Sequence, residues 1–139
     1  MRNLRRIATV CGLAAACTLA FGTSADATTY YASCSTTGAK GSMGADYPSG
    51  DLWEYDTFKI AMSVTDTAAD GHHVQIRFLS KEVGNSGTVK WPWHSFTSAN
   101  GDTFTFSTTA QDDYGIVATG VEVARYEGST YLNSCTDWS

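Results

Sequence analysis

Basic residues are scarce in this chain and do not gather into a patch. Nine lysines and arginines stand against fourteen aspartates and glutamates, and three of the nine lie within the first six positions. Because the others are scattered, no basic surface is expected for nucleic acid or for an anionic membrane. The formal net charge of −5 favours a soluble protein outside the cell.

Only one long hydrophobic run is present, and it lies at the N-terminus. Residues 7–21 are mostly apolar, follow the basic stretch Met1–Arg6, and precede the small-residue site Ala25-Asp26-Ala27. This order is that of a secretory signal peptide, and about 15 apolar residues are too few to span a bilayer, which takes about 20. We therefore predict a signal peptide over residues 1–27 and a secreted domain over residues 28–139, with no membrane attachment after cleavage. Cleavage would remove three basic residues and one acidic residue, so the net charge would become about −7.

Cysteine is rare in the predicted secreted domain. Cys11 and Cys17 belong to the signal peptide, where a lipid anchor on Cys17 is an alternative to simple cleavage. Cys34 and Cys135 remain as an even pair in an exported chain, so a disulfide between them is the expected state. Two free thiols or an intermolecular bridge are the alternatives. The disulfide would tie the first strand to the last.

Helical periodicity is missing from residues 28–139. Apolar and polar residues alternate in short runs, with turn residues at short intervals, which predicts antiparallel strands. We expect a single all-β domain, an antiparallel β-sandwich of about seven strands, with a small β-barrel as the alternative. The Gly- and Ser-rich segment Thr36–Gly50 is predicted to be a loop. The predicted strands cover residues 29–35, 57–65, 72–80, 88–96, 103–109, 116–126 and 130–135.

The alternation also predicts which side chains face the core. In residues 57–65 the large apolar side chains share one face; they are Phe58, Ile60, Met62 and Val64. Turns centred on residues 85–86 and 100–101 would form hairpins, in which directly opposed residues face the same side. The predicted pairs are Phe78–Trp93, Ser80–Trp91, Phe106–Ser95 and Phe104–Thr97. This register puts both tryptophans in the core and His94 on the solvated face, where Pro92 indicates an edge or a bulge.

The last predicted hairpin has two possible registers. A three-residue turn over Glu127–Ser129 places Cys135 opposite Val121, and we favour it because the sulfur then has apolar neighbours. A two-residue turn at Gly128-Ser129 would place Cys135 opposite Glu122.

The string Trp91-Pro92-Trp93-His94 is the most distinctive local feature of the sequence. Two tryptophans two positions apart can form an aromatic platform for sugar rings, whereas the pairing above favours two core side chains. Trp53 and Tyr55 are further candidates for exposed aromatic residues. The candidate binding residues are therefore Trp53, Tyr55, Trp91, Trp93 and His94.

Motifs for metal binding and catalysis are missing. His72 and His73 are adjacent, so they point to opposite faces of a strand, and no His-x-His or His-Glu-x-x-His spacing occurs. We expect no metal and no cofactor, with calcium held by loop acids such as Asp112-Asp113 as the alternative. No Gly-x-Ser-x-Gly elbow occurs, and no two carboxylates stand out as a glycosidase pair. Whether the chain is an enzyme is therefore uncertain, and these residues favour a protein without catalytic activity.

An Arg- and Ala-rich signal is followed by a Ser- and Thr-rich remainder that contains the strings Trp91-Pro92-Trp93 and Gly120–Arg125. In these features the chain as a whole resembles small secreted β-domain proteins of filamentous actinobacteria, without pointing to one named family. It implies no activity and transfers no functional residue.

Together these features predict a secreted, monomeric extracellular domain that binds a polysaccharide or an extracellular protein through exposed aromatic residues and loops. An inhibitor of an extracellular enzyme is the alternative, with Gly38–Gly50 as its exposed loop. A small hydrolase is the third possibility. Neither nucleic acid nor a membrane is an expected partner.

Overall fold

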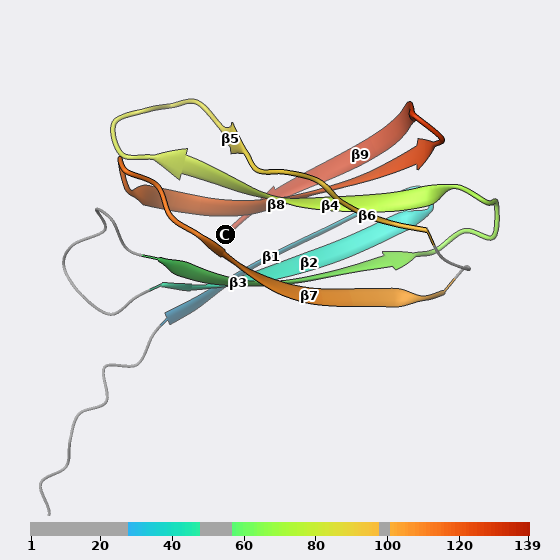
Figure 1. The fold of residues 1–139 in the computed structure, drawn as a ribbon, viewed down its shortest axis with the longest axis horizontal. Coiled ribbons are helices and arrows are strands. Elements are labelled where there is room, and N and C mark those ends of the chain that lie inside the picture. Colours follow the sequence, from blue (N-terminus) through green and yellow to red (C-terminus); the bar gives the residue numbers. More distant parts are fainter. Residues whose placement is uncertain (1–27, 48–56, 98–100) are drawn as a thin grey trace, which may run out of the picture.

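The structure, a computed structural model, describes residues 28–47, 57–97 and 101–139, which form two antiparallel sheets packed face to face (Figure 1). The strands are β1 (Thr28–Thr36), β2 (Ala39–Tyr47), β3 (Phe58–Asp66), β4 (His73–Glu82), β5 (Val89–Lys90), β6 (His94–Phe96), β7 (Thr103–Ala110), β8 (Ile116–Glu127) and β9 (Thr130–Trp138). One sheet has the strand order β1-β2-β3-β7; the other has the order β5-β4-β8-β9, and β6 also pairs with β4. This is the predicted β-sandwich with its one disulfide, and the barrel alternative is wrong because the sheets do not close. None of the described residues belongs to a helix that could cross a membrane. The predicted signal peptide lies outside the described residues.

The core faces predicted for two central strands are confirmed. All four large side chains of β3, from Phe58 to Val64, are buried, and so are Val74, Ile76 and Phe78 of β4. They meet in one cluster between the sheets. Full burial of one such side chain contributes about 1.5–3 kcal/mol, so these two faces supply much of the stability of the sandwich.

The segment Thr36–Gly50 is not the predicted loop, because Ala39–Tyr47 forms β2, an inner strand of its sheet. Two of its inward positions are fully buried alanines, and a third is Gly41. A Cβ atom on Gly41 would lie 2.7 Å from Val123 Cγ2 in the opposite sheet. The close approach of the two sheets therefore selects small residues here, which hides the apolar alternation of a strand. The exposed loop expected for an enzyme inhibitor is accordingly a strand over residues 39–47, and residues 48–50 lie outside the described part of the chain.

The single strand predicted over residues 88–96 is broken into β5 and β6. β5 pairs Ser80 with Val89, and β6 pairs Ile76 with His94, so neither predicted pair of this hairpin forms. Between them lies the Trp-Pro-Trp string of residues 91–93, where proline lacks the amide hydrogen that a ladder needs. The register shifts by one residue across this break. His94 consequently faces the core side instead of the solvent.

The predicted hairpin between β6 and β7 is also wrong. β7 joins the other sheet, where Phe106 lies opposite Met62 of β3 instead of Ser95. Phe104 and Phe106 nevertheless face the core, and Phe104 stacks on Phe96 across the two sheets with 4.6 Å between ring centroids. The face was predicted correctly because alternation is local, whereas the choice of sheet depends on the whole fold.

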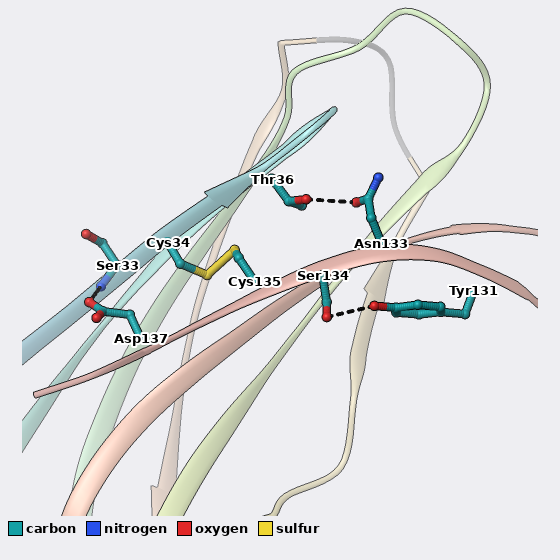
Figure 2. Close-up of a disulfide and its surroundings, with 8 residues drawn as sticks. All are labelled: Ser33, Cys34, Thr36, Tyr131, Asn133, Ser134, Cys135 and Asp137. Carbon is teal, nitrogen blue, oxygen red and sulfur yellow. Dashed lines mark hydrogen bonds between the residues drawn. A yellow bond between two sulfur atoms is a disulfide. The ribbon is translucent and has the colours of Figure 1, made fainter.

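Cys34 and Cys135 form the predicted disulfide, which joins β1 to β9 (Figure 2). The final turn is the two-residue turn, with Glu127 opposite Thr130, so the favoured three-residue turn is wrong. A bulge then makes Leu132 an extra residue of β9 and brings Cys135 opposite Val123. Both sulfurs are therefore partly buried against the core, as expected, although Val123 and not Val121 is the direct partner.

Tyr47 at the end of β2 gives the fold a pH dependence at the alkaline end. Burial raises the pKa of the Tyr47 phenol above its ordinary value of 10.0; the Thr119 hydroxyl lowers it, and the nearby Tyr30 adds to the rise. Well below pH 10 the phenol is protonated in both the folded and the unfolded chain. As the pH approaches and passes 10 the unfolded chain ionises first, so the free energy of unfolding falls as pH rises. We expect Tyr47→Phe to lose stability less steeply than the unmodified protein between pH 10 and 11 in urea titrations. Equal slopes would contradict this assignment.

Candidate functional site: a hydroxyl-lined groove

The outer face of the β1-β2-β3-β7 sheet carries a regular array of short polar side chains. Every second residue of a strand faces outward, and the register aligns the outward residues in four rows that cross the strands. From β1 to β7 the rows are Thr29-Asp46-Lys59-Thr109, Tyr31-Gly44-Ala61-Ser107, Ser33-Ser42-Ser63-Thr105 and Ser35-Lys40-Thr65-Thr103. Eleven of these sixteen side chains end in a hydroxyl group. We call these sixteen positions the hydroxyl array.

A groove of about 1000 Å³ crosses the array over all four strands. Its floor is the second row, where Gly44 has no side chain and Ala61 has only a methyl group. Tyr31 stands at one end of that row and is 75% exposed. A Cβ atom on Gly44 would lie 3.1 Å from Tyr31 Cε1, so the tyrosine ring rests against the glycine backbone. A second hollow of about 390 Å³ extends over the third and fourth rows.

The groove combines many hydrogen-bonding groups with little charge. Thr29 Oγ1 donates to Asp46 Oδ1 at 2.6 Å, and Lys59 is the next residue of that row. The hydroxyls of Ser42 and Ser63 bond to each other at 2.9 Å. A hydroxyl can donate one hydrogen bond and accept two, so even these paired groups keep capacity for a ligand. The surface therefore suits a polar, nearly neutral molecule that both donates and accepts.

Trp93 lies on the outer face of the other sheet, where its ring covers a cation. Arg77 Cζ is 4.1 Å from the centre of the Trp93 ring, and Arg77 Nε donates to Glu122 Oε2 at 2.7 Å. The ring of Tyr126 meets Trp93 edge-on, with 6.3 Å between centroids. Because a guanidinium group occupies one face of the indole, that face is not open to a sugar ring.

The other predicted site residues are not brought together with Trp93. Trp91 points to the opposite side of the sheet, packs against the core, and donates from Nε1 to Ser80 Oγ at 3.0 Å. His94 packs on Phe106 with 4.2 Å between ring centroids. Trp53 and Tyr55 lie outside the described residues. A platform formed by the two tryptophans of the string is therefore not present, and none of the described members of the set lies in the hydroxyl array.

The array was missed because its rows exist only once four strands are aligned. Ser33 and Ser35 fall in a predicted strand, but Ser42 and Gly44 fall in the segment predicted to be a loop. One local signal was available: the outward positions of β7, residues 103, 105, 107 and 109, are all serine or threonine. Such a run on one face of a strand marks a surface of uniform chemistry.

Within residues 28–47, 57–97 and 101–139, no three metal-ligating side chains gather into a cluster. Apart from Gly44 and Ala61, the side chains of the hydroxyl array are hydroxyls, two lysines and one carboxylate, a set that offers hydrogen bonds rather than metal ligands. No protein-family model matches the chain, and no curated protein matches its sequence.

Proposed function

We propose that this protein is a secreted, non-catalytic binding domain that holds a glycan chain along the groove of the hydroxyl array. The observation that carries the proposal is the coincidence of the groove, its hydroxyl-rich walls and the exposed Tyr31 ring at its end. Sugar hydroxyls both donate and accept hydrogen bonds, as serine and threonine hydroxyls do. The face of a tyrosine ring offers an apolar surface to the C–H groups of a sugar, and its hydroxyl stays in water.

The composition of the groove favours a glycan over a protein partner. The buried centre of a protein interface is typically enriched in aromatic residues, methionine and arginine. In the hydroxyl array Tyr31 is the one aromatic side chain, and the floor is formed by Gly44 and Ala61. Asp46 is already held by the hydroxyl of Thr29. A neutral polysaccharide is therefore the ligand class that this surface fits best.

The disulfide supports the extracellular part of the proposal. Disulfides form and persist in oxidising compartments and are rare in the cytosol. The Cys34–Cys135 bond therefore agrees with export by the predicted signal peptide over residues 1–27. Export itself is tested by the N-terminal sequence of protein recovered from culture medium, which we expect to begin at Thr28.

Two groove variants test the glycan site directly. Tyr31→Ala removes the ring, and Ala61→Gln fills the floor from an exposed position of β3 without touching the core. We expect the association constant for a panel of insoluble neutral polysaccharides to fall about tenfold for each variant, equivalent to about 1.4 kcal/mol. Co-sedimentation with cellulose, xylan, chitin and β-1,3-glucan measures this.

Tyr131→Ala is the matched control for the groove variants. Tyr131 is also an exposed tyrosine, but it lies on β9 in the other sheet. It is expected to bind as well as the unmodified protein. The proposal fails if the unmodified protein binds none of the polysaccharides, or if Tyr131→Ala weakens binding as much as Tyr31→Ala does.

A further inference from the structure

β7 is an edge strand without the usual protection against pairing. Among the described residues it pairs only with β3, over all eight of its residues and without a bulge. It contains no charged residue and no proline. An edge with these properties presents a row of backbone N–H and C=O groups to which another strand can bond.

The other sheet edges are protected. β1 and β9 are joined by the disulfide, and the Ser33 backbone amide donates to the Asp137 carboxylate at 2.9 Å (Figure 2). On the opposite side, β5 and β6 have two and three residues and are separated by the string around Pro92. Short strands, proline and covering contacts are devices that block edge pairing. Of the edges that the structure describes, only β7 lacks all of these devices.

Two phenylalanines make pairing at this edge favourable. Phe104 and Phe106 face the core from β7 but are only partly buried, and Phe96 covers them from the other sheet. A strand added beside β7 would remove more of their apolar surface from water, at about 25 cal/mol per Å². The uncharged strand is also a place where two copies of an acidic chain can approach without facing like charges.

We propose that two copies of this protein pair antiparallel through β7 and form one continuous eight-stranded sheet. A two-fold axis normal to the sheet and centred on Phe106 places Thr105 opposite the partner's Ser107 and Phe104 opposite the partner's Thr108. Such an interface is self-complementary, as a two-fold dimer requires. The Thr105–Ser107 pairs add cross-strand hydroxyl contacts on the outer face. The proposed dimer differs from the sequence-based expectation, which was a monomer.

The dimer would make the hydroxyl arrays of the two copies continuous. The groove of each copy reaches β7, so the two grooves would meet across the two-fold axis. A ligand that spans both copies would bind with the gain of a bivalent contact. The pairing itself needs no ligand and does not depend on the proposed glycan binding.

Sedimentation velocity of the purified protein without any polysaccharide tests the dimer. We expect a dimer at micromolar concentration, and dissociation when Thr105→Asp and Ser107→Asp are combined, because carboxylates would then oppose each other across the axis. The matched control combines Ala61→Asp and Ser63→Asp, which lie opposite Ser107 and Thr105 on the neighbouring strand β3. It adds the same charge to the same rows one strand away from the edge, so it should stay dimeric. We expect the dimer dissociation constant to rise at least tenfold for the β7 pair only.

Hydrogen exchange on the unmodified protein gives a second readout that needs no variant. Alternate backbone amides of β7 point away from β3 and should exchange more slowly as protein concentration rises. The proposal is overturned if the unmodified protein sediments as a monomer at every concentration. It is also overturned if the control variant dissociates as readily as the β7 variant, or if exchange in β7 is independent of concentration.

Discussion

Replacing Cys34 and Cys135 together by alanine is expected to lower the free energy of unfolding by about 4 kcal/mol, the largest effect of any change considered for this chain. The disulfide joins residues 101 positions apart. On the chain-entropy account, cross-linking a loop of about 100 residues lowers the conformational entropy of the unfolded chain, which stabilises the fold by about 4.7 kcal/mol. Measured stabilisation by a disulfide is typically about 2–4 kcal/mol. Urea unfolding of the variant and of the oxidised protein at the same pH measures the difference.

The contacts around the disulfide provide the control. β1 and β9 are also held by a hydrogen bond from Thr36 Oγ1 to Asn133 Oδ1 at 3.1 Å, which the double cysteine variant leaves in place. Thr36→Val removes this bond alone and should cost about 1 kcal/mol. Reducing the unmodified protein should reproduce the stability of the double alanine variant. An unchanged urea midpoint after loss of the disulfide would show that the other β1–β9 contacts suffice.

The parts of the fold that could be predicted are those in which large apolar side chains alternate locally. β3 is the clearest case, since Phe58 to Val64 alternate with polar residues and all four apolar side chains are buried. β2 has the same alternation in space, but three of its five inward positions are alanine or glycine. At one of them, Gly41 lies against Val123 of the opposite sheet. A strand is recognised in a sequence by large apolar side chains at alternate positions. Where two sheets approach closely, small residues take those positions, and the segment is predicted to be a loop.

Register and sheet membership could not be predicted from turns alone. One break at Pro92 and one extra residue at Leu132 each shift the pairing by a residue, and a shift of one residue exchanges the two faces of a strand. The face of Cys135 was predicted correctly although the predicted turn was wrong. The shorter turn shifts the register by one residue and the bulge shifts it by one more, so Cys135 returns to the predicted face. The hydroxyl array depends on three such registers at once, which is why no part of the chain by itself indicates the groove.

A charged side chain, that of Arg125, is buried at one end of the sandwich. Arg125 faces inward from β8 and is 8% exposed. Its guanidinium group contacts the Asp70 carboxylate, lies 2.6 Å from His72 Nδ1, and donates to the Thr37 carbonyl at 3.2 Å. Gly38 makes room for it: the residue has φ of +83°, and a Cβ there would lie 2.6 Å from Arg125 Nε. In the described part of the chain that Nε has no hydrogen-bond partner. The contacts with Asp70 therefore offset much of the free-energy cost of burying the guanidinium charge.

Asp70→Asn is therefore expected to lower the free energy of unfolding by about 2 kcal/mol. Removing one partner of a buried ion pair costs about 3–5 kcal/mol, and the cost is smaller here because the Asp70 side chain is 32% exposed and water screens the charge. Asp113→Asn is the matched control, since Asp113 is exposed and the chemical change is identical. Combining Asp70→Asn with Arg125→Met should recover most of the loss, because an apolar side chain needs no counter-charge. If Asp70→Asn and Asp113→Asn unfold at the same urea concentration, solvent must already balance the guanidinium charge, and the pair contributes nothing measurable to the fold.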